Sequence, residues 1–216
     1  MSTIQVNGDH YPAVIVEKSS EPLNGRLEIP LILSFPHSGE KYPDDFDTNP
    51  ELSFNVLDFP NDKYVNELYQ ERNNLNITSI HANFPRTYID VNRHQHNIDV
   101  NMIKKGEDWY GRIHPTGVET GTTLFWSKTK EVFEIYSKKL SHDELKQRLA
   151  KCFVPYHQLM TYHIQKIHQD HGKAFVLDCH SMTQFDGKKR GRKERPQIDI
   201  GNRNRSEEHT SELQSQ

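Results

Sequence analysis

The stretch IPLILSFPH, residues 29–37, joins a nearly continuous apolar run to a proline and a histidine. A short run of this composition, bounded by turn residues, predicts a strand over residues 29–35 that is buried on both faces. His37 then follows the carboxyl end of that strand. Ligands of open α/β sheets bind at the carboxyl ends of the strands, so His37 is a candidate functional residue.

A similar arrangement lies near the end of the chain. Residues 173–179 hold the most apolar strand pattern of the sequence and predict a second buried strand, which His180 follows directly. Two such histidines and one carboxylate would bind zinc and leave it a fourth position for water. The candidate carboxylate is Asp62, in the first turn of a helix predicted over residues 61–73. We therefore predict a zinc site at His37, Asp62 and His180, while the alternative that each histidine only caps a strand end stays open.

The remaining patterns alternate between strands and helices. Apolar, β-branched runs predict further strands over residues 11–16, 77–81, 87–91 and 197–201. Ser141 and Glu144 form a capping box, which opens a helix that runs to Gly172, and Pro155 should kink or divide this helix. Residues 92–123 predict a long polar loop. Together these patterns predict an α/β fold, with a mixed central sheet and helices on both faces.

The bulk composition fits one globular domain and a small-molecule partner. The chain has 216 residues, of which 33% are hydrophobic, and its 27 basic and 30 acidic residues give a net charge of -3. No overall field therefore attracts it to nucleic acid or to an anionic membrane. Because the N-terminus lacks a signal sequence and no apolar run approaches the ~20 residues that span a bilayer, we expect a cytoplasmic protein. Cys152 and Cys179 are expected to be reduced and buried.

Two arginines flank the predicted strand over residues 87–91 and are candidates for substrate binding. Arg86 precedes the strand, and Arg93 follows it after Asn92. A guanidinium at a strand end is suited to holding a substrate carboxylate by a bidentate pair. A salt bridge to Asp90 or Asp99 is an equally open alternative.

Two other clusters offer rival interpretations. His94 and His96 form an H-x-H pair like those of barrel-type metal hydrolases, but the chain is short of the ~250 residues of such a barrel and lacks its eightfold repeat. The basic run over residues 187–195 could contact nucleic acid. It has no interleaved aromatic residue, so a solvated loop is favoured, and the run is the main support for a function other than catalysis.

Four motifs taken together carry a family resemblance. FPHSG (residues 35–39), YIDVNR (88–93), DCHSM (178–182) and DIGNR (199–203) resemble, in order and spacing, the N-formylglutamate amidohydrolase family. The resemblance implies a fold similar to the zinc carboxypeptidases and a zinc enzyme that cleaves N-formylglutamate to glutamate and formate, in histidine breakdown. It implies that His37 and His180, with Asp62 as third ligand, hold the zinc, and that Asn92 and Arg93 bind a substrate carboxylate.

The family's general base is a glutamate near the C-terminus, for which this chain offers no candidate. Residues 205–215, RSEEHTSELQS, lack apolar periodicity and match the peptide encoded by a common sequencing adapter. We therefore expect residues 1–204 to form one domain that is incomplete at its C-terminus, and residues 205–216 to be a non-native tail. Such a chain could bind zinc yet turn over slowly or not at all, so a non-catalytic metal-binding fragment or a nucleic-acid-binding module with a basic loop is the alternative function.

Overall fold

The computed structural model describes most of the chain between its second residue and Ser181. The described residues are 2–18, 29–70, 75–106, 109, 117–129, 133–181 and 200–201. The chain divides into two compact units, Met1–Ser181 and Met182–Gln216, and every element below belongs to the first. The basic run, the tail and most of the predicted strand over residues 197–201 lie outside the described residues. Among the helices described, none has the length and apolar character needed to cross a membrane.

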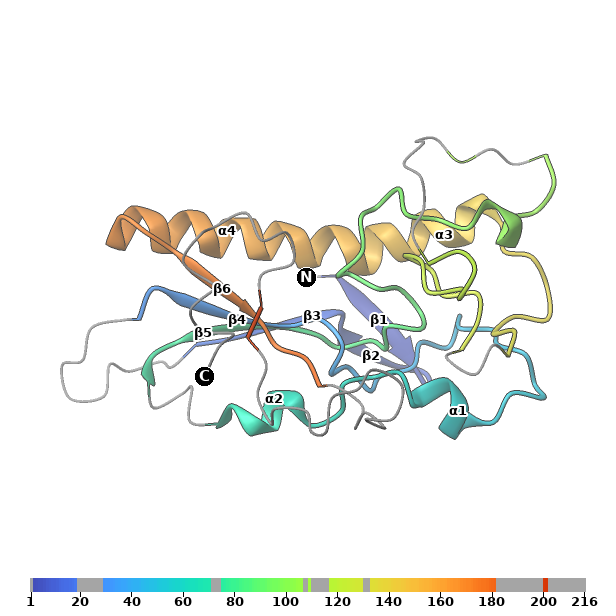
Figure 1. Cartoon of the computed structure of the whole chain (residues 1–216), viewed down its shortest axis with the longest axis horizontal. Helices are drawn as coiled ribbons and strands as arrows, with labels where there is room; N and C mark the ends of the chain where they lie inside the picture. Colours follow the sequence, from blue (N-terminus) through green and yellow to red (C-terminus); the bar gives the residue numbers. More distant parts are fainter. Residues whose placement is uncertain are drawn as a thin grey trace, which may run out of the picture. The chain divides into compact units, whose positions relative to one another are not determined.

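A mixed four-stranded sheet forms the centre of the first unit. Its strand order is β3-β5-β4-β6, and a separate antiparallel hairpin, β1-β2, precedes it (Figure 1). Strand β4 pairs in parallel with both β5 and β6, whereas β3 is antiparallel to β5. The strands span Thr3–Val6 (β1), Asp9–Pro12 (β2), Val14–Glu17 (β3), Leu31–Phe35 (β4), Thr78–Ala82 (β5) and Phe175–Asp178 (β6). The predicted mixed sheet is confirmed.

Helices cover both faces of this sheet, as the sequence pattern predicts. The long helix α4 (Val154–His171) lies along one face, where its Tyr156 hydroxyl contacts Ser34 of β4 at 2.8 Å. On the other face, Leu33 and Phe35 of β4 pack with Val65 of α2 (Val65–Leu68). Helix α1 (Phe54–Asp58) precedes α2 in the same crossover between β4 and β5. Burial of β4 between these layers confirms the prediction made from its apolar run.

The helix that begins after Ser141 follows the sequence signals closely. The Ser141 hydroxyl accepts the backbone N–H of Glu144, and the Glu144 carboxylate accepts the backbone N–H of Ser141, so the predicted capping box is present at the start of α3 (His142–Arg148). A π-helical turn, Leu149–Phe153, then leads into α4. Pro155, which cannot donate a backbone hydrogen bond, lies just after this turn, so the helix changes geometry there and continues. It ends at Gly172, whose φ is 73°.

Four predicted elements differ from the structure. Residues 87–91 are a buried loop and not a strand, because the N–H groups of Tyr88 and Ile89 turn back to the carbonyl of Pro85. The predicted strand over residues 11–16 is divided between β2 and β3. The helix predicted from residue 61 begins only at Val65 and is short, since Tyr64 has a left-handed φ of 63°. Strand β6 is not buried: Phe175 and Val176 are 57% and 45% exposed.

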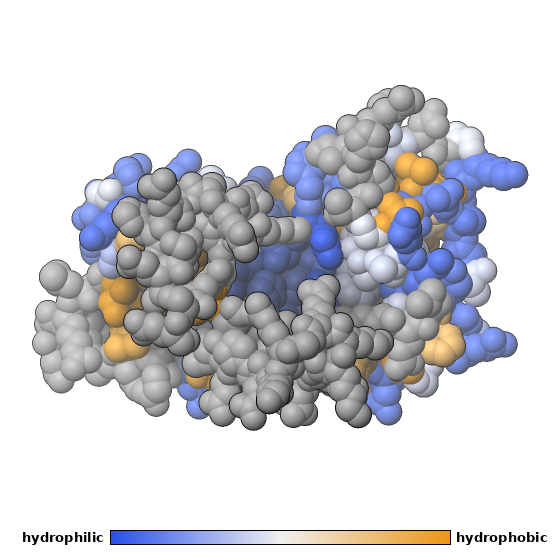
Figure 2. All heavy atoms as spheres, viewed as in Figure 1, coloured by the Kyte–Doolittle hydropathy of each residue, from blue (hydrophilic) through white to orange (hydrophobic). Residues whose placement is uncertain are grey.

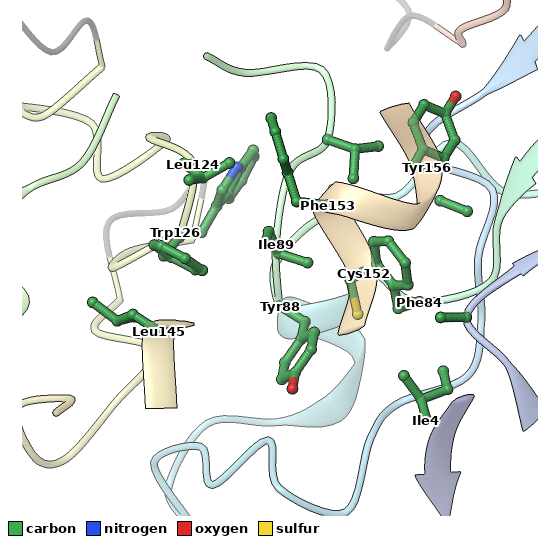
Figure 3. Packing of buried hydrophobic residues seen from close by; sticks show 14 of the residues in the cluster. Ile4, Phe84, Tyr88, Ile89, Leu124, Trp126, Leu145, Cys152, Phe153 and Tyr156 are labelled. Carbon is green, nitrogen blue, oxygen red and sulfur yellow. The ribbon is translucent and has the colours of Figure 1, made fainter. Parts of the chain in front are cut away.

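The main hydrophobic core lies between the helices α3 and α4, one face of the sheet and the loops beside it (Figure 3). Cys152 and Phe153, from the π-helical turn, pack near Ile89 and Phe84. The loop over residues 87–91 therefore owes its apolar character to core packing, which an isolated sequence pattern does not distinguish from sheet pairing. Cys152 and Cys179 are both buried and free of disulfides, as predicted.

Candidate metal centre

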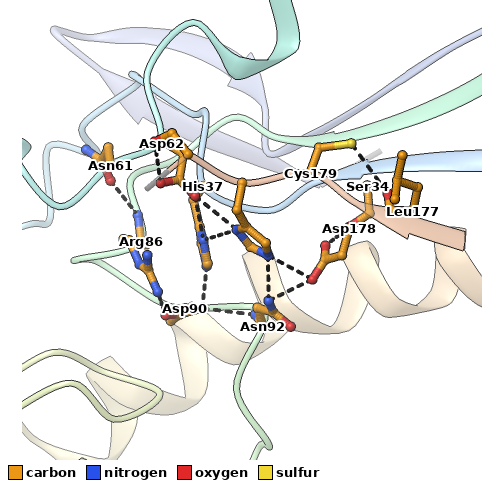
Figure 4. Close-up of polar contacts among 12 residues, drawn as sticks. Ser34, His37, Asn61, Asp62, Arg86, Asp90, Asn92, Leu177, Asp178 and Cys179 are labelled. Atoms are coloured by element: carbon orange, nitrogen blue, oxygen red, sulfur yellow. Dashed lines mark hydrogen bonds and ion pairs between the residues drawn. The ribbon is translucent and has the colours of Figure 1, made fainter. Parts of the chain in front are cut away.

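Strand pairing brings the two predicted histidines together. Ser34 of β4 is opposite Asp178 of β6 in the parallel register, so the chain leaves both strands at the same edge and reaches His37 and His180 within a few residues. Asp62 joins them from the loop before α2, where its backbone N–H donates to the His37 carbonyl at 2.9 Å. Figure 4 shows His37 and Asp62 facing each other beyond the end of the strands.

The three side chains converge on one point. His37 Nδ1 lies 3.2 Å from His180 Nδ1 and 3.3 Å from Asp62 Oδ2, and His180 Nδ1 lies 3.0 Å from the same Asp62 oxygen. Donor atoms around a tetrahedral zinc ion, with bonds of about 2.0–2.1 Å, stand about 3.3 Å apart. Within the described part of the chain, this is the only group of three or more potential ligands close enough to share a metal ion.

The outer nitrogens of both rings decide which atoms face the centre of this triangle. His37 Nε2 lies 2.7 Å from Asp90 Oδ1, and His180 Nε2 lies 3.0 Å from Asp178 Oδ2. A carboxylate only accepts hydrogen bonds, so in the neutral His37 ring Nε2 carries the hydrogen and Nδ1 presents a lone pair. Asp178 favours the same tautomer in His180, whose Nε2 also lies 3.1 Å from the Asn92 amide nitrogen. Two imidazole lone pairs and one carboxylate oxygen then point inwards. This donor set fits a divalent cation, and it matches the carboxylate–histidine–metal pattern of many metal sites.

The electrostatics of the triangle favour an ionised carboxylate. Burial alone raises the pKa of Asp62, but His180 and His37, which donate to it when their Nδ1 atoms are protonated, and then Ser181 outweigh burial and hold that pKa below its ordinary value. Burial opposes the charged form of His180, yet its hydrogen bonds to Asp178 and Asp62 raise its pKa to about 9. Protons therefore compete for the His180 lone pair when no cation is bound.

The carboxylate of Asp178, at the end of β6, supports the triangle by contacting His180. Asp178 receives a hydrogen bond from Ser34 Oγ at 2.6 Å, and Ser34 in turn contacts the Tyr156 hydroxyl. Asn92 Nδ2 donates to the other Asp178 oxygen at 2.7 Å, the oxygen that also accepts from His180. Asp178 is thus fixed by Ser34 of β4, which Tyr156 of α4 contacts in turn, and by Asn92 of a loop, and it orients the His180 ring.

The three predicted substrate-binding residues lie beside the triangle but make different contacts. Arg86 is committed to Asp90, with an Nη2–Oδ2 distance of 2.8 Å, and stacks over Trp126. Arg93 approaches Asp90 only through Nε, at 3.8 Å. The salt bridge to Asp90, left open by the sequence, is therefore present for both arginines. Their role in substrate binding stays a prediction, as does that of Asn92.

Several residues of this site were not identified from the sequence. The sequence predicts Asp90 only as a salt-bridge partner, and it gives no separate role to Asp178 or to Ser181, which both lie in the DCHSM motif. The Ser181 hydroxyl donates to Asp62 Oδ1 at 2.9 Å. Asp178 could have been found, because a carboxylate two residues before a ligand histidine on a strand points to the same edge. Asp90 had no such local signal, since it approaches from a loop.

The rival pair lies apart from this group. His94 and His96 stack edge to face, with ring centroids 5.2 Å apart, and they do not join any cluster of three potential ligands among the described residues. Figure 2 shows hydrophilic side chains in a recess near the middle of the face in view.

Comparisons with known proteins agree with this fold. A family model described as N-formylglutamate amidohydrolase matches residues 29–215. A crystal structure of N-formylglutamate amidohydrolase from Ralstonia eutropha JMP134 superimposes with a TM-score of 0.72 at 28% identity, over 80% of this chain and 59% of that chain. A gene product of Agrobacterium tumefaciens has a TM-score of 0.54 at 20% identity, over 81% of this chain and 58% of its own, and supports the fold alone.

This chain thus spans less than two thirds of the length of either solved structure. No curated protein sequence matches it. The family model covers most of the chain, including His37, Asp62, Asp90 and His180. The chain belongs to the N-formylglutamate amidohydrolase family.

Proposed function

We propose that this protein is a zinc-dependent hydrolase that cleaves the amide of N-formylglutamate to glutamate and formate, or that of a similar small N-acyl amino acid to the amino acid and the carboxylate of its acyl group. The observation that carries the proposal is the triangle of His37 Nδ1, His180 Nδ1 and Asp62 Oδ2, whose members lie 3.0–3.3 Å apart. Membership of the amidohydrolase family supplies the substrate class.

His37, Asp62 and His180 would hold the metal ion in this proposal. A zinc ion bound there would polarise the amide carbonyl and lower the pKa of water towards ~7. Nitrogen and carboxylate donors favour zinc over calcium or magnesium, which prefer oxygen ligands alone. The side chains of His37 and Asp62 are almost fully buried, at 2% and 7% exposure, whereas His180 is 32% exposed, so the site opens on the His180 side.

Arg93 is the residue best suited to bind the substrate carboxylate. Among the described residues, its guanidinium makes one long contact, to Asp90, and it is 22% exposed, which leaves donors for a substrate at the edge of the site. Arg86 donates a hydrogen bond from Nη2 to Asp90, and its guanidinium stacks over the Trp126 ring. It therefore contributes mainly positive charge to the site. Asn92 adds an amide donor close to His180. A planar, permanently charged fork is the group that best matches a carboxylate.

Hydrolysis also requires a general base, and among the described residues of the site no carboxylate is free for this role. Each carboxylate near the triangle already has partners. Asp62 contacts His37, His180 and Ser181. Asp178 contacts His180, Asn92 and Ser34. Asp90 is fully buried against His37 and Arg86. A general base needs a free lone pair within reach of the water it deprotonates. This observation favours a second candidate function, that of a non-catalytic metal-binding protein with the same fold.

One experiment separates the two candidates. The full chain is dialysed against zinc, its metal content is measured, and formate release from N-formylglutamate is followed by a coupled formate dehydrogenase assay. About one zinc per chain with zinc-dependent formate release supports the hydrolase, and His37→Ala should abolish both. Stoichiometric zinc without formate release supports the metal-binding protein, and absence of zinc binding rejects both candidates.

A further inference from the structure

The peptide unit between Val91 and Asn92 is held on both of its polar sides. Its carbonyl, on Val91, accepts a hydrogen bond from His157 Nε2 at 3.0 Å. Its N–H, on Asn92, donates to Asp90 Oδ1 at 3.0 Å. A peptide unit is planar and nearly always trans, so its C=O and N–H point in opposite directions. Bonds to both groups therefore fix the orientation of the plane, and with it the directions in which the next side chains leave the backbone.

The two residues after Val91 reach the metal site from this peptide unit. The Asn92 side-chain amide donates to Asp178 Oδ2 at 2.7 Å (Figure 4). Arg93 comes next, and its backbone N–H closes a turn onto the Asp90 carbonyl at 3.0 Å. A rotation of the peptide unit would therefore move both the amide of Asn92 and the guanidinium of Arg93.

The His157 ring acts as a neutral donor with a fixed position. It is half-buried and packs against Phe153, with ring centroids 4.2 Å apart. A carbonyl oxygen only accepts hydrogen bonds, so Nε2 carries the hydrogen. Burial lowers the pKa of His157, although the bond to the Val91 carbonyl opposes this effect, so the ring is neutral at neutral pH.

The same helical segment also holds the start of this loop. Arg148, the last residue of α3, is 2% exposed, and its Nη1 donates to the Tyr88 carbonyl at 3.2 Å. Its guanidinium lies over the Tyr88 ring, 4.2 Å from the centroid, and donates to the Tyr136 hydroxyl at 2.6 Å. The loop is thus bound to the helix at Tyr88 and again at Val91.

The π-helical turn between α3 and α4 allows one helix to make both contacts. Along a regular α-helix each residue adds about 100° of rotation, so positions 148 and 157 would face nearly opposite sides. The turn Leu149–Phe153 lies between them. A π-turn takes up one residue more than an α-turn, so the rotation between the two positions falls to roughly 80°. Both side chains can then reach the same loop.

We propose that His157 is a positioning residue, which holds Asn92 and Arg93 through the Val91 carbonyl so that they can receive a substrate carboxylate. The inference rests on the proposed function, because that function assigns the carboxylate to these two residues. The effect of His157 passes through the backbone, so His157 itself need not touch the substrate. Arg148 serves the same loop but also packs against Tyr88 in the core, so its substitution would not separate positioning from stability.

The test compares His157→Leu with His157→Gln in the full chain. Leucine keeps an apolar contact with Phe153 but cannot donate a hydrogen bond, whereas the amide of glutamine can place a donor near the position of Nε2. Calorimetry on zinc-loaded protein should show that His157→Leu binds glutamate about 5- to 10-fold more weakly, and that His157→Gln recovers most of this loss. Backbone amide exchange, measured by NMR, should become faster at Asn92 and Arg93 in the leucine variant and stay close to wild type in the glutamine variant.

Zinc affinity and a second histidine separate positioning from general damage. Among the described contacts, His157 bonds to none of the three proposed zinc ligands, so zinc affinity should change little in both variants. His168→Leu, the same substitution at an exposed position of α4, is the matched control and should leave all three measurements unchanged. A general loss of stability would instead speed amide exchange throughout the core and lower zinc affinity as well.

The outcomes are separable from those that test the function. Wild-type glutamate affinity together with wild-type exchange at Asn92 and Arg93 in His157→Leu would overturn the inference. Equal losses in the leucine and glutamine variants would also overturn it, because the hydrogen-bond donor would then not be the cause. If the wild-type protein binds zinc but not glutamate, the proposed substrate is wrong; faster exchange confined to Asn92 and Arg93 in His157→Leu would still support the positioning role, and unchanged exchange would reject it.

Discussion

His37 Nδ1 and His180 Nδ1 lie 3.2 Å apart, each with its other nitrogen on a buried or half-buried carboxylate. Two lone pairs at this distance repel each other unless a cation or a proton lies between them. Asp62 supplies one negative charge beside both rings. Without a metal ion, the site is therefore either destabilised by this repulsion or binds a proton. In both cases, metal binding and folding depend on each other.

Zinc should stabilise the folded chain. At a free zinc concentration of about 100 times the dissociation constant, linkage predicts a gain of about 2.7 kcal/mol in the free energy of unfolding, or a rise of about 5 to 10 °C in Tm. Differential scanning calorimetry with zinc and with chelator measures this rise. His180→Asn should abolish it, whereas His94→Ala, in the rival H-x-H pair, should keep it in full. Loss of the rise in His94→Ala would instead favour the rival cluster.

Zinc affinity should increase with pH. The pKa of His180 in the metal-free site is raised to about 9, because its hydrogen bonds to Asp178 and Asp62 outweigh the opposing effect of burial. Between about pH 7 and 9, zinc must displace this proton, so the apparent affinity should rise by roughly tenfold per pH unit and level off above pH 9. Calorimetric titrations in two buffers of different ionisation enthalpy should find about one proton released near pH 7.5; an affinity independent of pH in this range would contradict the raised pKa.

The same pKa shift has a consequence for the metal-free fold, with a defined sign. Because the folded pKa of His180 lies above its usual value, protonation favours the folded state. The stabilisation is complete below about pH 6.5 and disappears as the pH rises through about 9. Denaturant melts of chelator-treated protein at pH 6.5 and 9.5 should show the loss, and His180→Asn should reduce it.

The strand ends and their histidines could be predicted from the sequence because short apolar runs and the residues that follow them are local signals. The capping box at Ser141 and Glu144 is local as well, and it is present as predicted. The prediction of Asp62 rests on a helix start, which the structure places a few residues later. The position of Asp62 beside His37 therefore depends on the loop before the helix. The hydrogen bond from the Asp62 backbone N–H to the His37 carbonyl fixes this loop.

The features that escaped prediction are tertiary. Residues 87–91 have the composition of a strand, yet they form a buried loop that carries Asp90 to His37, and only packing against Trp126 and the helices decides this. Strand β6 is apolar but exposed at Phe175 and Val176, because the described helices cover its neighbours and not these side chains. Burial depends on what a strand packs against, which a single apolar run does not specify.

Gly39 should be required for the loop that holds His37. A Cβ atom at this position would stand 2.4 Å from the backbone oxygen of Phe84, and a backbone atom cannot move aside as a flexible side chain can. Gly39→Ala should therefore cost about 1–3 kcal/mol of folding stability and weaken zinc binding, since the loop must shift. Gly201→Ala, where none of the described residues places an atom within 4 Å of the added Cβ, is the matched control. Urea melts and zinc titrations of both variants test this, and a Gly39→Ala protein as stable as Gly201→Ala would refute the close approach.

Arg86 and Arg93 should have separable effects, although they contact the same carboxylate. Arg86→Met removes the 2.8 Å partner of a fully buried Asp90 and should cost about 3 kcal/mol of stability, because the remaining charge is poorly compensated. Arg93→Met breaks only a 3.8 Å contact and should change stability little, while it weakens binding of glutamate, the proposed product, on the order of tenfold. Lys128→Met, at an exposed pair with Glu134, is the control for loss of one positive charge.

Calorimetric titration with glutamate and urea melts on the three zinc-loaded variants separate these effects. The assignment of substrate binding to Arg93 requires that its loss lowers glutamate affinity more than the loss of Lys128 does, at unchanged stability. If Arg86→Met weakens glutamate binding while the protein stays as stable as the wild type, the two arginines have exchanged roles, and the ion pair with Asp90 must open when substrate binds. Equal weakening in all three variants would mean that only the net charge of the protein matters, and that neither guanidinium contacts the carboxylate.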